Sequence, residues 1–123
     1  MIRKTKGSKH DYDLQNDSIF FYGEDNNYKS SIDFDGIVID FNEEDYLMSI
    51  EILDASEKFN FSKQDLLNIK NFHATIEVTK ENIELTMNLK ISKRNRLVAS
   101  SLDAITINSM NIPSSTQGIA VNC

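Results

Sequence analysis

The sequence contains few of the residues that mark several common classes of protein. Its 123 residues include one cysteine, Cys123, one proline, two histidines and no tryptophan. A single cysteine excludes an intrachain disulfide, so we predict a reducing, cytoplasmic location. No apolar run approaches the roughly 20 residues that a membrane-spanning helix needs. The basic segment 1–10 is not followed by the apolar region of a secretory signal.

Glycine is also scarce, with four residues in the whole chain, and none forms a glycine-rich phosphate-binding loop. Apolar residues make up 40% and charged residues 26%, as in soluble globular proteins. We therefore predict one domain over residues 1–123, with a flexible basic arm at 1–9 and a weakly ordered tail at 110–123.

Acidic charge is concentrated in one segment. Residues 1–10 carry four bases, residues 11–57 fourteen acids and one base, and residues 58–123 eight bases and five acids, giving +4, −13 and +3 and a net charge of −6. The acidic segment would repel phosphate groups, so we predict that it does not bind nucleic acid. A basic protein partner, a cation or a homo-oligomer would suit this chain. A solvated acidic face is the alternative.

A hairpin within residues 35–58 organises the pattern. The apolar, β-branched runs 37–41 and 46–53 flank four polar residues, a length that suits a hairpin loop. We expect Tyr46, Met48, Ile50 and Ile52 to share one face of the second strand. A short helical turn is predicted to begin after Asp54.

Other segments also predict strands. Residues 83–91 alternate strictly between apolar and polar, which predicts an antiparallel strand with one buried face. Residues 10–14, 19–22, 28–33, 74–79, 96–101, 104–109 and 119–121 predict further strands. The fold class expected is α+β, a mostly antiparallel β-sheet arranged as two packed sheets or a partly closed barrel.

One short helix is predicted near residues 62–71. Ser62 and Asp65 have the spacing of a capping box, and Leu66, Ile69, Phe72 and His73 recur three to four residues apart. His73 would then be a half-buried packing residue at the end of the apolar stripe.

The acidic hairpin is the first candidate for chemistry. Asp40, Asn42, Glu44 and Glu51 have the spacing of ligands one, three, five and twelve of a calcium-binding EF-hand loop. Asp45 occupies the position where that loop needs glycine, and both flanks predict strands rather than helices. These residues are therefore weak candidates for a metal site, and a polar hairpin tip is the alternative.

Three other features carry less information. A metal site joining His10 and His73 lacks the three or four ligands that zinc requires. Cys123 has no basic neighbour to activate a thiolate. The bases Lys90, Lys93, Arg94 and Arg96 cluster near one turn, either as an anion-binding patch or as a solvated turn. We predict no cofactor and no catalytic residue.

Glu51 is unusual because it lies between two isoleucines of a predicted strand. An unpaired buried carboxylate is costly, so Glu51 is either solvated on a partly open face or buried with a partner. We favour the solvated position.

The first half resembles a family of short archaeal and bacterial proteins known only as a domain of unknown function. The resemblance rests on Tyr12-Asp13, on residues 17–21, on the Asp-Gly-Ile-Val-Ile-Asp run at 35–40, on the acidic turn 42–45 and on residues 49–56. Members of that family usually have glycine where this chain has Asp45 and Ser49. The resemblance implies a small β-rich fold and brings no known activity.

The sequence therefore predicts a non-enzymatic protein-interaction module with an acidic face. The alternative is a divalent-metal-binding protein or small enzyme that uses the acidic hairpin 40–51.

Overall fold

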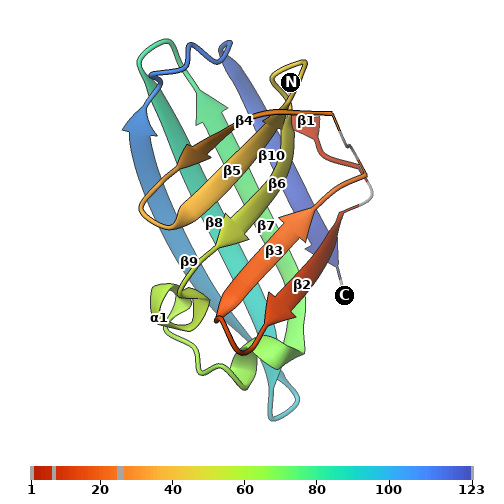
Figure 1. Ribbon diagram of the computed structural model, residues 1–123. Coiled ribbons are helices and arrows are strands. Elements are labelled where there is room, and N and C mark those ends of the chain that lie inside the picture. Colours follow the sequence, from red (N-terminus) through yellow and green to blue (C-terminus); the bar gives the residue numbers. More distant parts are fainter. Residues whose placement is uncertain (1, 7, 25–26, 123) are drawn as a thin grey trace.

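The computed structural model describes residues 2–6, 8–24 and 27–122, which form two β-sheets packed face to face (Figure 1). Sheet A has the order β1 (Arg3–Lys4), β10 (Ser115–Asn122), β7 (Ile69–Val78), β8 (Asn82–Lys93) and β9 (Arg96–Ile107). Sheet B has the order β2 (Lys9–Asp13), β3 (Ser18–Tyr22), β6 (Leu47–Ile52), β5 (Ile37–Asn42) and β4 (Tyr28–Asp33).

Neighbouring strands are antiparallel, except that β1 runs parallel to β10. The prediction of a mostly antiparallel β protein with two packed sheets and a short helix is confirmed. The described strands do not close into a barrel, because β1, β9, β2 and β4 lie at sheet edges.

The helix predicted near residues 62–71 is wrong, whereas the short helical turn predicted to begin after Asp54 is confirmed as α1 (Ala55–Phe59). Residues 62–71 contain only the 3-10 helix η1 (Asp65–Asn68) before β7 begins. The capping box does form, with the Asp65 carboxylate 3.1 Å from the Ser62 nitrogen and the Ser62 hydroxyl 3.0 Å from the Asp65 nitrogen. Among the described residues, no helix is long and apolar enough to cross a membrane.

A bulge at the start of β7 explains the misleading helical spacing. The pairing of β7 with β8 shifts register between Ile69 and Asn71, so Ile69 and Phe72 both point into the core although they are three residues apart. An extra residue in a strand produces this spacing without a helix. His73 then points outward and is exposed, which corrects the prediction of a half-buried packing residue.

Aromatic side chains join the two sheets. Phe72 is the one aromatic residue after Phe61, and its ring stacks on Phe21 of sheet B with centroids 3.6 Å apart and planes 3° apart. Both side chains are buried, as are most inward-facing aliphatic residues of β7 and β8. The predicted alternation of residues 83–91 is confirmed within β8.

The hairpin of β5 and β6 is confirmed, with one change of face. Its pairing shifts register between Asp40 and Phe41, which places Leu47 in the core and leaves Tyr46 exposed. The predicted strands 96–101 and 104–109 are one continuous strand, β9, which pairs with β8 without a bulge.

Strands lie at both ends of the described chain, and the predicted strand 119–121 is part of β10. Lys4 of the expected arm pairs with Gly118 at the edge of sheet A, and residues 1 and 7 lie outside the described part. The expected tail contributes β10, which lies between β1 and β7 and buries Ile119 and Val121. Cys123 lies outside the described residues, so the prediction made for it stays a prediction.

Candidate functional site

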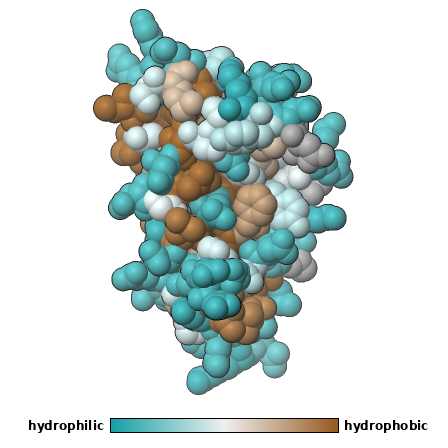
Figure 2. Space-filling view, in the orientation of Figure 1, coloured by the Kyte–Doolittle hydropathy of each residue, from teal (hydrophilic) through white to brown (hydrophobic). Residues whose placement is uncertain are grey.

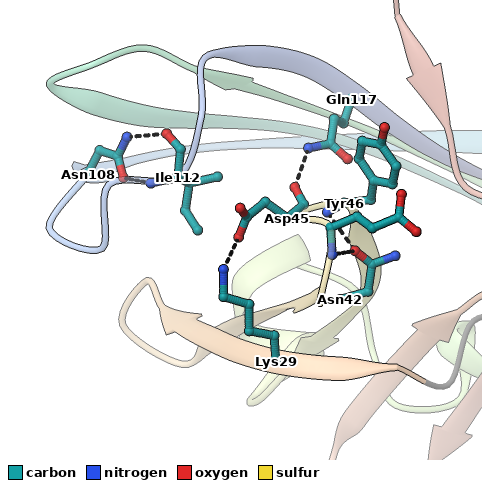
Figure 3. A network of polar contacts seen from close by, with 8 residues as sticks. Lys29, Asn42, Asp45, Tyr46, Asn108, Ile112 and Gln117 are labelled. Carbon is teal, nitrogen blue, oxygen red and sulfur yellow. Dashed lines mark hydrogen bonds and ion pairs between the residues drawn. The ribbon is translucent and has the colours of Figure 1, made fainter.

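The acidic hairpin tip uses its polar groups to hold itself in place (Figure 3). Asn42 is buried, and its side-chain oxygen accepts hydrogen bonds of 2.9 Å from the backbone N–H groups of Glu44 and Tyr46. Asp45 has a left-handed backbone with φ 63°, a conformation that aspartate adopts more easily than most residues. An aspartate can therefore occupy the position where the family usually has glycine.

The tip is also tied to both sheets. The carboxylate of Asp45 forms an ion pair of 2.8 Å with Lys29 of β4. Gln117 of β10 is buried, accepts a hydrogen bond of 2.7 Å from the Leu47 N–H and donates one of 3.1 Å to the Asp45 carbonyl. Figure 3 shows Gln117 reaching across to the tip from the opposite sheet. This hairpin end is a structural junction.

The structure disperses the four candidate metal ligands. Asp40 points outward from sheet B and accepts hydrogen bonds from the hydroxyls of Ser31 at 2.5 Å and Ser49 at 2.7 Å. Glu44 is exposed at the tip, whereas Glu51 is half-buried. Within residues 2–6, 8–24 and 27–122, no group of three or more His, Cys, Asp or Glu side chains could hold a metal ion.

Glu51 lies on the outer face of sheet B, where its cross-strand neighbours are Val38 and Phe20. Its partial exposure fits the solvated position that we favoured. The two histidines lie in different sheets: His10 is on β2, with its ring 6.2 Å from that of Phe21, and His73 is on β7.

A hollow on the outer face of sheet A is the best-formed candidate site. It measures about 190 Å³ and lies where β1, β10 and β7 run side by side. Residues of all three strands and of the adjoining chain line it: Ile2, Lys4, Thr5, His73, Thr75, Gly118, Ile119 and Ala120.

The small residues of β10 create the hollow. Gly118 pairs with Thr75 on one side and with Lys4 on the other, and Ala120 pairs with His73. A β-carbon on Gly118 would lie 3.2 Å from the Ala74 carbonyl oxygen and 3.8 Å from the side chain of Ile2. The larger side chains of β1 and β7 therefore form the two walls of the hollow, and Gly118 and Ala120 of β10 form its floor.

The walls combine groups suited to an anion. Lys4 is an ammonium donor, Thr75 carries a hydroxyl, and the His73 imidazole can donate a hydrogen bond. The exposed side chain of Ile2 adds apolar surface. Such a mixture of apolar lining and a few convergent polar groups is typical of small-molecule sites.

Sequence reasoning missed this hollow because its residues come from three distant segments. Lys4 lay in the expected arm, His73 in the expected helix and Gly118 in the expected tail. The available signal was the pair of small residues Gly118 and Ala120, two positions apart at the start of the predicted strand 119–121. Alternate residues share one face of a strand, so that spacing indicates a low strip on a sheet.

These observations define a two-sheet β-sandwich with a small polar hollow on one outer face. The chain belongs to the same family as the two relatives described below. The model named "Protein of unknown function (DUF2283)" matches its residues 9–56. The match covers β2 to β6 and the beginning of α1. The predicted resemblance to a domain of unknown function is confirmed.

Two relatives from methanogens extend the similarity beyond that segment. A protein of Methanosarcina mazei named "Putative hypoxanthine phosphoribosyltransferase" is 60% identical over 123 residues, which cover all of both chains. "Uncharacterized protein MJ0789" of Methanocaldococcus jannaschii is 42% identical over 89 residues, covering 72% of this chain and 77% of the relative. No solved structure matches the chain.

The Methanosarcina mazei relative overturns the predicted function. The prediction was a non-enzymatic protein-interaction module, whereas the relative, 60% identical over the full chain, carries the name of an enzyme. The alternative of a metal-binding protein or small enzyme that uses hairpin 40–51 stays a prediction. Within that hairpin, the side chain of Asn42 is already bonded to the backbone of Glu44 and Tyr46.

Proposed function

We propose that this protein binds a phosphoribosyl compound in the hollow over Gly118. The observation that carries the proposal is the position of Lys4 and His73 on opposite walls of a floor made of Gly118 and Ala120. The relative's name supports the ligand class, because a hypoxanthine phosphoribosyltransferase handles a phosphate ester of ribose and a purine base.

The size of the hollow limits what it can hold. Sites that enclose a drug-sized ligand usually measure about 300–1,000 Å³. At about 190 Å³, this hollow would enclose the phosphate and ribose of a nucleotide and leave the base on the surface of the sheet. The phosphate would contact Lys4, and Thr75 would provide a hydroxyl to the ligand.

Local charge favours an anion here although the chain is acidic overall. The segment 1–10 carries four bases, and its strand β1 forms one wall of the hollow. The fourteen acids of residues 11–57 belong to the segment that forms sheet B, whereas the hollow lies on the outer face of sheet A. A basic segment beside a concave site raises the local concentration of anionic ligands.

The test is a titration followed by ¹H–¹⁵N NMR, with inosine 5′-monophosphate, inosine, hypoxanthine and a phosphoribosyl pyrophosphate donor as probes. We expect the monophosphate to shift the amide signals of Thr75, Gly118 and Ala120. Inosine, which lacks the phosphate, should bind at least about tenfold more weakly because it loses the charge-assisted contact to Lys4. Equal binding of both compounds, or no shift at millimolar concentrations, would refute the proposal.

Matched variants locate the site. Lys4→Gln and His73→Gln should each weaken binding of the monophosphate, and Ala120→Leu should block it by filling the floor. Lys90→Gln is the control, because Lys90 also points outward from sheet A but lies outside the hollow. A transfer assay with hypoxanthine and the pyrophosphate donor then measures whether binding is accompanied by turnover.

A further inference from the structure

The free edge of β9 has the properties of a strand that pairs with another strand. β9 follows β8 from Arg96 to Ile107 without a bulge, and no described strand lies on its other side. Leu97, Ile105 and Ile107 are 62%, 61% and 72% exposed, more than any other large apolar residue in the described part of the chain. A long, regular and apolar edge is a template for β-pairing.

β9 is contacted by α1, where the Ser100 hydroxyl donates a hydrogen bond of 2.7 Å to the Phe59 carbonyl, but it lacks the protections of the other sheet edges. β1 has only two residues, and β2 exposes the charged side chains of Lys9, Asp11 and Asp13. The pairing of β4 is irregular between Tyr28 and Ser30. Short strands, exposed charges and bulges are the usual protections of edge strands. Figure 2 shows apolar surface at the upper left, where Figure 1 places the end of β9.

We propose that β9 pairs with β9 of a second copy of this chain. The two strands would run antiparallel about a twofold axis and join the two five-stranded A sheets edge to edge. The pairing would satisfy backbone groups along an edge of about 40 Å, since each residue of a strand spans about 3.4 Å. It would also cover the exposed apolar side chains of both copies.

The sequence of β9 selects one register for this pairing. Opposed residues must lie on the same face of the sheet, and the odd-numbered residues of β9 point outward. With the axis at Leu102, Leu97 lies opposite Ile107 of the second copy and Ala99 lies opposite Ile105. All three highly exposed apolar residues then have apolar partners.

The neighbouring registers are worse. An axis at Asp103 would place the two Asp103 carboxylates opposite each other, and like charges in opposed positions destabilise a sheet. An axis at Ser101 would place Ile107 opposite Asn95, in the turn between β8 and β9, and Asp103 opposite Ala99. Only the axis at Leu102 avoids both conflicts.

Charge at the two ends of β9 favours the antiparallel arrangement. Basic residues lie in and beside the turn at its beginning: Lys90, Lys93, Arg94 and Arg96. The other end of β9 lies beside two acidic residues. Glu84 of β8 pairs with Ile105. Glu81, in the turn between β7 and β8, accepts a hydrogen bond of 2.9 Å at its carbonyl from the Asn108 N–H. Antiparallel pairing brings the basic end of each copy toward the acidic end of the other.

The experiment is light scattering coupled to size-exclusion chromatography, on the full chain with a reductant present to keep Cys123 reduced. At concentrations on the order of 100 µM, a micromolar dimer would be almost fully formed. We expect a particle of twice the chain mass of 14.1 kDa. A monomer under these conditions would refute the proposal.

Two paired variants test the register. The double variant Leu97→Lys with Ile107→Lys places lysines opposite each other at both ends of the paired β9 strands. It should weaken dimerisation by at least tenfold, because opposed like charges repel. Leu97→Lys with Ile107→Glu places a lysine opposite a glutamate and should retain the dimer. The control is Leu14→Lys with Leu67→Lys, two exposed residues away from β9. Identical behaviour of the two β9 variants, or loss of the dimer in the control, would refute pairing through β9.

Discussion

The hydroxyl of Tyr12 on β2 donates a hydrogen bond of 2.8 Å to the carboxylate of Asp17, in the turn before β3. That carboxylate also accepts hydrogen bonds from the Ser56 hydroxyl at 2.6 Å and the Ser56 N–H at 3.1 Å. Asp17 thus caps α1 from a distant turn and fixes the helix to sheet B. All three residues lie within the segment 9–56 that the family model matches, so this part of the pattern has a structural role.

We predict that Asp17→Asn lowers the free energy of unfolding at pH 7 by about 1–3 kcal/mol, the usual cost of losing hydrogen bonds to a buried charged group. The asparagine side chain has one acceptor oxygen, whereas the carboxylate accepts bonds from both Tyr12 and Ser56. Urea unfolding measures the change. Asp35→Asn is the control, since Asp35 is exposed and asparagine also tolerates its positive φ of 55°. Equal losses in the two variants would contradict this role.

The same network predicts a pH dependence. Burial alone would raise the pKa of the Asp17 carboxyl, but the hydrogen bonds from Ser56 and Tyr12 outweigh it and lower that pKa below the ordinary 3.8. A lowered pKa in the folded state stabilises the protein above pH 3.8, and this stabilisation is lost as the pH falls through the folded pKa. The unfolding free energy of Asp17→Asn should therefore fall less steeply below pH 4 than that of the wild type.

Tyr12 gives the opposite dependence at high pH. Burial, the hydrogen bond to Asp17 and the negative charge of Asp17 raise the pKa of Tyr12 above its ordinary 10. A raised pKa stabilises the fold below pH 10, and that contribution is lost as the pH rises further. Tyr12→Phe removes the ionisable group, so the variant should lose less stability than the wild type between pH 9 and about 11. A parallel decline of both proteins in urea unfolding would contradict the assignment.

The sequence identified those elements whose pattern is local. Strict alternation predicted β8, and two β-branched runs around a polar turn predicted the β5–β6 hairpin. The same reasoning failed at two bulges. The bulge between β5 and β6 places Leu47 in the core in place of Tyr46. The bulge between β7 and β8 gives Ile69 and Phe72 a spacing like that of a helix. A bulge depends on the partner strand, which periodicity within one segment does not reveal.

The remaining misses depend on distant contacts. A strand of two residues, such as β1, is too short to show periodicity in the sequence. Lys4 belongs to a strand because it pairs with Gly118 of β10. The buried centre of β10 consists of a polar residue, Gln117, and a glycine, Gly118. Such residues are typical of loops, so the sequence of β10 does not indicate a strand there. The hollow combines both of these strands with His73 of β7, which explains why the sequence did not indicate it.

The stacking of Phe72 on Phe21 makes Phe72 a sensitive core position. We predict that Phe72→Ala lowers the free energy of unfolding by about 3–5 kcal/mol, from lost burial and the cavity that remains. Phe20→Ala is the matched control, because Phe20 is half-buried on the outer face of sheet B, where it stacks on Tyr22 at 4.9 Å. Its loss should be about 1 kcal/mol. Similar losses in both variants would show that the inter-sheet contact is not a core contact.

Gln117 provides a test of the junction between the sheets. Gln117→Leu keeps the approximate size of the side chain but leaves the Leu47 N–H and the Asp45 carbonyl without their partner. Each unsatisfied buried group costs about 1–3 kcal/mol, so we expect a total loss of about 2–4 kcal/mol in thermal or urea unfolding. Gln64→Leu, at an exposed position before η1, should change stability by less than about 0.5 kcal/mol. A neutral Gln117→Leu variant would contradict the junction.

Asp40 and Glu51 are two carboxylates on the outer face of sheet B that differ in their partners. Asp40 accepts hydrogen bonds from Ser31 and Ser49, whereas the cross-strand neighbours of Glu51 are the apolar Val38 and Phe20. Asp40→Asn should therefore cost about 1–2 kcal/mol of unfolding free energy at pH 7, because the amide keeps one acceptor oxygen and its nitrogen cannot accept the second of those bonds. Glu51→Gln should cost less than about 1 kcal/mol, because water solvates the half-buried carboxylate and no described partner is lost. Urea unfolding of both variants side by side measures the difference, and a loss of several kcal/mol in Glu51→Gln alone would mean that Glu51, and not Asp40, holds this face together.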